Sequence, residues 1–186
     1  MHIFAYGSLI NLDSASKAVG YSVNKSDVIS AKLTGFKRTW DLVDTVYSNS
    51  LCKNVNAVFL NLTASTGMFV NGILISIKEK ELSSIAKREK NYDIVDVSSK
   101  VYFSECGCKQ QYPHKNIYTA IAKEQFKIAN ENNTFFLDEY EKLVMKGVVS
   151  FGKQFLEEYL NTTETSNLKK LNGHYEFVNP LQNSLA

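Results

Sequence analysis

The chain has 186 residues, 44% of them hydrophobic and 22% charged, which is ordinary for one globular domain and argues against a disordered or linker-rich chain. The net charge is only +2 and the lysines are scattered, so the sequence predicts neither a nucleic-acid partner nor a polybasic membrane contact. Three cysteines, no signal-peptide pattern and no long apolar run predict a reduced, cytoplasmic protein that does not span a membrane.

Strand patterns fill the first two thirds of the chain. The apolar run 3–6 ends in Gly7-Ser8, which indicates a buried strand followed by a turn. Residues 11–20 are expected to form a loop with a short helical turn. Gly67 is placed in a turn, and Gly72 indicates a bulge or a close backbone approach within a strand. Further strands are predicted from β-branched and aromatic runs at 28–33, 36–43, 55–62, 69–77, 95–103 and 117–121.

A helix predicted over residues 78–88 has a carboxylate on the continuation of its apolar face. Leu82, Ile85, Ala86 and then Glu89 share that face. A carboxylate facing a core must find partners or keep its proton, because burying an unpaired charge is costly. Desolvation raises its pKa, and a carboxyl poised nearer neutrality can both accept and donate a proton. The other interpretation leaves Glu89 at a frayed helix end, in solvent or paired with a neighbouring basic side chain.

The last third of the chain has helix patterns. One helix is predicted over 137–146 with Gly147 as its stop, and a second over 148–160. Residues 161–186 are polar and weakly patterned, and we expect a partly ordered C-terminal extension to a domain that covers residues 1–160. Strands followed by helices indicate an α+β fold, in which a curved antiparallel or mixed sheet carries helices on its outside.

The residues Tyr6-Gly7-Ser8-Leu9 follow the first predicted strand. A strand that ends in Gly-Ser can turn so that consecutive backbone N–H groups point at one spot. Such a nest binds a carboxylate or a developing oxyanion. The other interpretation of these residues is an ordinary strand-to-loop turn, and the motif alone does not decide between the two.

Two further motifs point to other classes of site. Cys106-Gly107-Cys108 with His114 has the residue types of a metal or redox site, but its spacing is not C-x-x-C and no second ligand pair stands nearby. Phe36-Lys37-Arg38-Thr39-Trp40 mixes basic and aromatic residues as a nucleic-acid-binding strand does, and we interpret it as a strand with one wet face. We therefore predict no metal and no cofactor.

Three blocks occur in the same order as in the γ-glutamylcyclotransferase-like superfamily, which includes ChaC-like and AIG2-like branches. Phe4 to Ile10 resembles the N-terminal strand and the Tyr-Gly-Ser loop of this superfamily. Residues 88–92 resemble the segment with the catalytic glutamate, and their sequence is most similar to that of the ChaC-like branch. Residues 140–147, followed by a helix through Tyr159, are similar to the C-terminal block of the AIG2-like branch. The chain departs from the family after Tyr92, where many relatives carry a basic residue and none stands here.

The resemblance covers about residues 1–160 and implies a small mixed or antiparallel β-barrel with flanking helices. It implies that Glu89 is the general acid/base, that Tyr6, Gly7, Ser8 and Leu9 hold the γ-glutamyl group, and that Tyr140 lies near the substrate. The implied reaction is attack of the substrate's own α-amine on its γ-carbonyl, which releases 5-oxoproline and an amine or peptide, as in glutathione metabolism. The alternative is a non-catalytic protein of the same fold that binds a γ-glutamyl compound or another small molecule.

The substrate and the oligomeric state stay open. The sequence does not choose among glutathione, a γ-glutamyl amino acid and a γ-glutamylamine, and the last would make the protein an AIG2-like lyase of γ-glutamylamine side chains. The resemblance is mixed, since the middle of the chain resembles one branch and the end another. The loop from Cys106 to Asn116 and the extension after residue 160 are expected to shape the choice of substrate.

Overall fold

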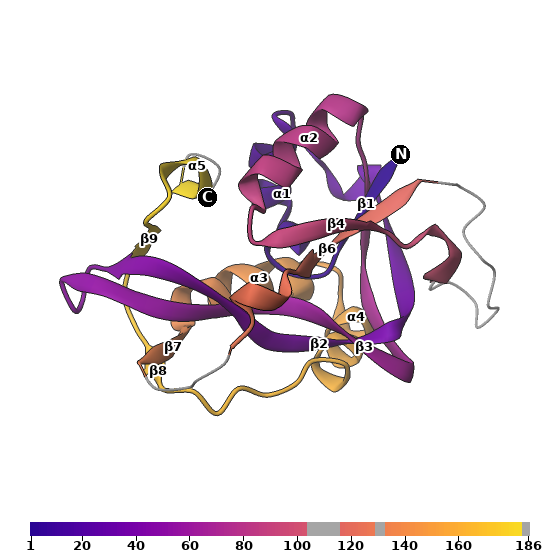
Figure 1. The fold of residues 1–186 in the computed structure, drawn as a ribbon. Coiled ribbons are helices and arrows are strands. Elements are labelled where there is room, and N and C mark those ends of the chain that lie inside the picture. Colours follow the sequence, from indigo (N-terminus) through magenta and orange to yellow (C-terminus); the bar gives the residue numbers. More distant parts are fainter. Residues whose placement is uncertain (104–115, 129–132, 184–186) are drawn as a thin grey trace.

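A computed structural model describes residues 1–103, 116–128 and 133–183, which are organised around a long ribbon of two strands (Figure 1). The strands are β1 (His2–Ala5), β2 (Val28–Ser48), β3 (Lys53–Ser76), β4 (Tyr92–Asp96), β5 (Val101–Phe103), β6 (Ile117–Ala122), β7 (Thr134–Leu137), β8 (Lys170–Leu171) and β9 (Tyr175–Phe177). The helices are α1 (Leu12–Val19), α2 (Glu79–Arg88), α3 (Asp138–Ser150), α4 (Lys153–Asn161) and α5 (Pro180–Asn183). Short 3-10 turns are η1 (Ser8–Ile10), η2 (Lys25–Asp27), η3 (Ser98–Lys100) and η4 (Glu124–Phe126).

The strands form one mixed sheet in the order β4-β6-β1-β3-β2-β5, with β7 beside β3 and β9 beside β2. β1 runs antiparallel to β3 and parallel to β6. The strands β1 and β3 approach so closely that a Cβ atom on Gly72 of β3 would lie 2.4 Å from the carbonyl oxygen of Ala5 in β1, which confirms the close approach predicted at Gly72. The sheet curls into a half-barrel with helices packed around it, so the predicted α+β class and curved mixed sheet are confirmed.

Two pairs of strands that were predicted as separate are continuous in the structure, as β2 and β3. Between Thr34 and Phe36 the register of β2 slips against β3, and Gly35 stands opposite residues 65–68. Gly35 and Gly67 have φ angles of 83° and 79°, so the ribbon bends through a bulge without ending. The prediction of Gly67 in a turn was wrong, because a glycine that bends a strand gives the same sequence signal as one that ends it.

The helix predicted to stop at Gly147 continues to Ser150 as α3. Gly147 is buried, and a Cβ atom there would lie 2.5 Å from the backbone nitrogen of Asn11. The glycine therefore permits close packing of α3 against the start of α1, and its function is not termination. The next helix begins correspondingly late, at Lys153, while its end agrees with the prediction to within one residue. Across the described residues, no helix is long and apolar enough to cross a membrane.

The segment 11–20, expected as a loop with one turn, forms the helix α1. The Asn11 side chain caps it by accepting hydrogen bonds from the backbone N–H groups of Asp13 and Ser14, at 3.1 and 3.3 Å. The buried face of α1 consists of small residues, chiefly alanines, so it gave little hydrophobic periodicity to detect. The prediction of a loop with only a short helical turn was wrong, because a helix occupies Leu12–Val19.

The strand predicted over 95–103 is interrupted. β4 ends at Asp96, whose Oδ1 accepts hydrogen bonds from the N–H and the hydroxyl of Ser98, at 2.8 and 2.6 Å, and starts the 3-10 turn η3. The predicted loop after it, with Cys106, Cys108 and His114, lies outside the described residues.

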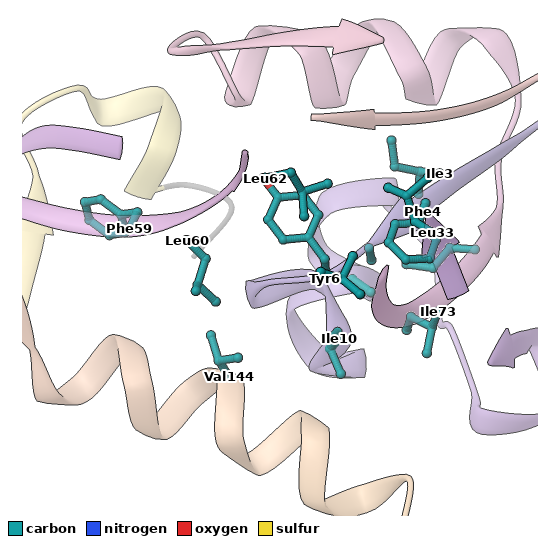
Figure 2. Packing of buried hydrophobic residues seen from close by; sticks show 14 of the residues in the cluster. Ile3, Phe4, Tyr6, Ile10, Leu33, Phe59, Leu60, Leu62, Ile73 and Val144 are labelled. Atoms are coloured by element: carbon teal, nitrogen blue, oxygen red, sulfur yellow. The ribbon is translucent and has the colours of Figure 1, made fainter. Parts of the chain in front are cut away.

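The core lies between the curled sheet and α3. Figure 2 shows Leu60 of β3 pointing toward Val144 of α3, with Tyr6 and Ile10 beside them from the segment that follows β1. Ile10 and Val144 are almost completely buried, and each such side chain contributes roughly 1.5–3 kcal/mol to folding. The turn after β1 is therefore anchored in the core on both of its sides.

Two short strands of the segment after residue 160, β8 and β9, join the same sheet, and the helix α5 follows them. β8 pairs in parallel with β7, and β9 pairs antiparallel with the end of β2, where Val46 faces Phe177. Figure 1 shows β9 and α5 beside the far end of the β2–β3 ribbon. In this segment, which was expected to be partly ordered, strand pairing and aromatic contacts hold residues 170–171 and 175–177 against the rest of the sheet. We call residues 175–183 the strap.

Candidate active site

The turn Tyr6-Gly7-Ser8-Leu9 leaves the end of β1 and enters η1. The N–H of Ile10 donates to the carbonyl oxygen of Gly7 at 2.9 Å, which closes the turn and leaves the preceding N–H groups without a partner inside it. A Cβ atom on Gly7 would lie 3.4 Å from the hydroxyl oxygen of Tyr140, so the turn passes directly beside that hydroxyl. The fold therefore places the Tyr140 hydroxyl next to the tight turn at Gly7.

Glu89 ends α2 and faces the same region. Its N–H still donates to the carbonyl oxygen of Ile85 at 2.8 Å, but its own backbone has left the helical conformation. The Glu89 side chain is 20% exposed, and the Nε atom of Arg88 lies 3.5 Å from its Oε1. Both interpretations of the sequence are thus partly right, since Glu89 stands at the helix end beside Arg88 and is largely removed from water. Ala86 is exposed, so the predicted apolar face was wrong at that position.

Two small cavities meet at Glu89, and Ser8, Tyr92 and Tyr140 also line both of them. The first, which we call the turn cavity, offers about 40 Å³ to water and is also lined by Leu60, Ile85, Ala120 and residues 3–9. The second, the strap cavity, offers about 60 Å³ and is also lined by Ser14, Leu42, Asp44, Phe59, Arg88, Asn91, Leu143, Tyr175, Phe177 and Gln182. All six residues predicted for the site, Tyr6, Gly7, Ser8, Leu9, Glu89 and Tyr140, line the turn cavity.

Three tyrosines line the turn cavity as neutral phenols: Tyr6 and Tyr140 are buried, and Tyr92 is half-buried. The hydroxyl of Tyr6 donates to the carbonyl oxygen of Ala120 and that of Tyr92 to the carbonyl oxygen of Leu60, both at 2.8 Å. Desolvation raises the pKa of Tyr6 and of Tyr92 well above the usual value, and the nearby Tyr140 and Glu89 raise both further. Burial likewise raises the pKa of Tyr140. These hydroxyl groups therefore stay protonated and polar at any physiological pH.

The Glu89 carboxyl has an unusual protonation equilibrium. Burial raises its pKa, the Arg88 guanidinium lowers it, and the Asp44 carboxylate raises it further, with a net upward shift. A carboxyl with a raised pKa is a better proton acceptor than an ordinary glutamate and still releases its proton easily. The described residues contain no group of three or more metal-ligating side chains.

Arg38 holds the turn in place, a role that was not predicted from the sequence. It is fully buried, and its Nε donates to the carbonyl oxygen of Tyr6 at 2.9 Å. Its Nη1 donates to the Thr163 hydroxyl at 2.8 Å, its Nη2 donates to the carbonyl oxygen of Asn71, and its guanidinium lies 4.0 Å from the ring centre of Tyr159. These partners are carbonyl groups, hydroxyl groups and an aromatic ring. Among the described residues, Arg38 forms no ion pair with a carboxylate. Burial lowers the pKa of its guanidinium.

Residues of the strap also line the site, although none of them was predicted from the sequence, which indicated only that the extension after residue 160 shapes the choice of substrate. Phe177 stacks on Phe59 with ring centres 5.2 Å apart, and the Nε2 of Gln182 donates to the Oδ2 of Asp44 at 2.9 Å. The side chain of Asn183 bonds both the N–H and the carbonyl of Phe177, at 2.7 and 2.6 Å, and ties α5 to β9. The alternating aromatics Tyr175 and Phe177 are a strand signal, but nothing local in the sequence says which strand they join.

Comparison with known proteins identifies the fold. No protein-family profile and no curated protein sequence matches this chain. A structure described as a γ-glutamyl cyclotransferase superposes with a TM-score of 0.58 at 16% identity, over 100% of this chain and 97% of that one. An uncharacterised protein from Homo sapiens, loc79017, gives 0.59 at 16% identity over 99% and 96%. YkqA from Bacillus subtilis gives 0.59 at 20% identity over 89% of this chain and 56% of YkqA. The chain therefore has the γ-glutamylcyclotransferase-like fold.

Proposed function

We propose that a chain with this fold and this partly sequestered glutamate is a γ-glutamylcyclotransferase, which converts a γ-glutamyl compound to 5-oxoproline and a free amine or peptide. The observation that carries the proposal is the convergence of Glu89 with the Tyr6–Leu9 turn on one cavity. The fold shared with a γ-glutamyl cyclotransferase supports it. Fold alone does not determine function, so the proposal depends on the chemistry of the site.

In this proposal the substrate supplies its own nucleophile. The α-amine nitrogen attacks the γ-carbonyl carbon, a C–N bond closes the five-membered lactam, and the bond to the leaving nitrogen breaks. The α-ammonium loses two protons in becoming the lactam N–H, one before the attack and one after the C–N bond has formed, and the leaving nitrogen gains two in departing as an ammonium. Glu89 accepts each proton in turn and returns it to the leaving group, so the charges balance over one turnover. The raised pKa of its carboxyl suits both steps.

The turn cavity has the second task, which is to hold the flexible glutamyl chain in the bent shape that precedes ring closure. The backbone N–H groups of Ser8 and Leu9 are the donors for the substrate carboxylate or for the developing oxyanion, and one such donor is typically worth about 2.7–4 kcal/mol in the transition state. The neutral hydroxyl of Tyr140 lies beside the turn and adds a hydrogen-bonding group.

The test is direct detection of 5-oxoproline by liquid chromatography and mass spectrometry. The purified protein is incubated with glutathione, with γ-glutamyl amino acids and with γ-glutamylamines, and at least one of them is expected to release 5-oxoproline in proportion to enzyme. A well-folded protein that binds one of these compounds but releases no 5-oxoproline from any would favour the non-catalytic binding protein instead.

The pH dependence follows from the sign of the shift at Glu89. The carboxyl must be ionised to accept a proton, so kcat/KM falls as pH drops through its pKa in the free enzyme. Because that pKa is raised, the acid limb is expected above the ordinary glutamate value of about 4.3. Asp44→Asn removes a charge that raises the pKa, so the limb is expected to move to lower pH in this variant. A limb that stays in place in Asp44→Asn would assign it to another group.

A further inference from the structure

The strap cavity lies where the leaving group of the proposed reaction would go. It shares Ser8, Glu89, Tyr92 and Tyr140 with the turn cavity, so the two cavities adjoin at the acid/base residue. A substrate whose glutamyl group fills the turn cavity, with its scissile amide at Glu89, extends its other half toward the strap. This inference rests on the proposed function and assigns the part of the site that recognises the leaving group.

Aromatic rings form the apolar wall of this cavity. Phe59 of β3 stacks on Phe177 and lies 6.3 Å from Tyr175 between ring centres, while Tyr175 and Phe177 meet edge to face at 5.6 Å. Two of the three rings come from the strap. Because the cavity offers only about 60 Å³ to water, the wall suits a small aliphatic group.

Arg88 supplies a donor without an acceptor. Its side chain is nine-tenths buried, at 10% exposure, and its Nε makes the 3.5 Å contact with Glu89. Its Nη1 is buried and has no hydrogen-bond partner among the described residues. A buried guanidinium nitrogen in that state is costly, and a carboxylate oxygen is the acceptor that matches it best.

Gln182 supplies an acceptor without a donor. Its Nε2 is committed to Asp44, which fixes the orientation of the amide and makes the Oε1 the free end. That Oε1 is also buried without a partner among the residues that the structure describes. The Asp44 carboxylate accepts hydrogen bonds from Gln182 and from the N–H of Thr45, the latter at 2.8 Å. A ligand in the cavity could therefore add an acceptor for the Nη1 of Arg88 and an N–H donor for the Oε1 of Gln182.

We propose that Arg88 and Gln182 recognise the leaving group, and that Arg88 selects one with a carboxylate on the carbon next to the scissile nitrogen. A γ-glutamyl amino acid satisfies all three features, since its amide N–H suits Gln182, its carboxylate suits Arg88 and its side chain suits the aromatic wall. A γ-glutamylamine has the N–H and the apolar group and leaves Arg88 unpaired. Sites built to bind a polar group reject analogues that lack it for this reason.

The test uses two compounds that differ only by that carboxylate, γ-glutamyl-alanine and γ-glutamylethylamine. Their dissociation constants are measured by calorimetry with Glu89→Gln, which cannot turn them over in the proposed mechanism. γ-Glutamyl-alanine is expected to bind roughly tenfold more tightly or better. Adding Arg88→Gln is expected to reduce the ratio to about one by weakening only the alanine compound, and adding Arg88→Lys to leave an intermediate ratio.

Two further variants separate specific from general effects. Lys90→Gln removes an exposed positive charge two residues away and is expected to leave the ratio unchanged. Gln182→Leu is expected to weaken both compounds by similar factors, because both carry the amide N–H. Melting temperatures verify that each variant is folded.

The inference is overturned if the folded Glu89→Gln/Arg88→Gln protein keeps the ratio of dissociation constants measured with Glu89→Gln alone. Equal binding of the two compounds to the Glu89→Gln protein would also overturn it. The proposed function fails separately. The expected binding preference without any 5-oxoproline release by the wild-type protein leaves the recognition inference intact and overturns the cyclotransferase. Release of 5-oxoproline from both compounds with equal kcat/KM, together with equal binding, supports the cyclotransferase and overturns the recognition inference.

Discussion

Glu89→Gln is expected to lower kcat for 5-oxoproline release by roughly 10²–10⁴-fold, the usual contribution of a positioned general acid/base. The amide has nearly the shape of the carboxyl but cannot carry a proton between the α-ammonium and the leaving nitrogen. Substrate binding should change little, because the turn and strap cavities supply most of the contacts. The measurement is single-turnover kinetics together with the dissociation constant of the substrate.

The same substitution has a second expected result, on stability. Burial favours the protonated form of Glu89, so this group stabilises the fold fully only below its pKa in the unfolded chain, and that contribution is lost as pH rises through the higher folded pKa. At neutral pH the glutamine variant should therefore melt no lower than the wild-type protein. Glu79→Gln, in the exposed first turn of the same helix, is the control and should leave the rate unchanged and lower the melting temperature only slightly, through the lost interaction with the helix dipole. Near-normal turnover by Glu89→Gln would remove Glu89 from the mechanism.

Arg38→Met is expected to lower the free energy of unfolding by roughly 2–5 kcal/mol. Methionine is similar in length and apolar, so the packing volume is largely kept. What is lost is the set of donors to the carbonyl oxygens of Tyr6 and Asn71 and to the Thr163 hydroxyl, and the two carbonyl oxygens stay buried. Removal of the desolvated guanidinium offsets part of the loss. Urea denaturation measures the change.

Lys37→Met is the matched control for Arg38. Lys37 is the preceding residue on the same strand, and it pairs with Glu164 at the surface, where such ion pairs contribute little. Its substitution should change the free energy of unfolding by about 0.5 kcal/mol or less. Arg38→Met should also reduce turnover beyond what stability explains, because the Tyr6 carbonyl at the start of the turn loses its anchor. Equal stability of the two variants would show that the buried guanidinium is dispensable.

The sequence predicted the parts of the fold and site that depend on local pattern. The helix that ends at Glu89 has acidic residues first and basic residues last, and the strand before the Tyr6–Leu9 turn is a plain apolar run ended by glycine. The sequence also contained a signal for Arg38 that was not used. Phe36, Arg38 and Trp40 alternate and so share one face of β2, which places a guanidinium in line with two aromatic residues.

The remaining errors concern contacts between distant segments. Gly67 and Gly147 have the composition signals of a turn and a helix stop, and only the packed structure shows that one bends a strand and the other admits Asn11. The extension after residue 160 was expected to shape the choice of substrate, but no residue of the strap could be named, because its pairing with β2 joins residues about 130 positions apart, where Val46 faces Phe177. Chain topology, not local preference, decides such pairings.

The position of β1 between β3 and β6 has a consequence for how the two cavities come into being. Its four residues pair with residues 73–76 on one side, and its first two pair with 117 and 118 on the other. No short stretch of the chain holds both flanks of the turn, so loop-closure entropy opposes any partly folded form that contains it. The geometry of the candidate site therefore depends on the whole sheet, and a change that loosens β3 or β6 alters the two cavities without contacting them.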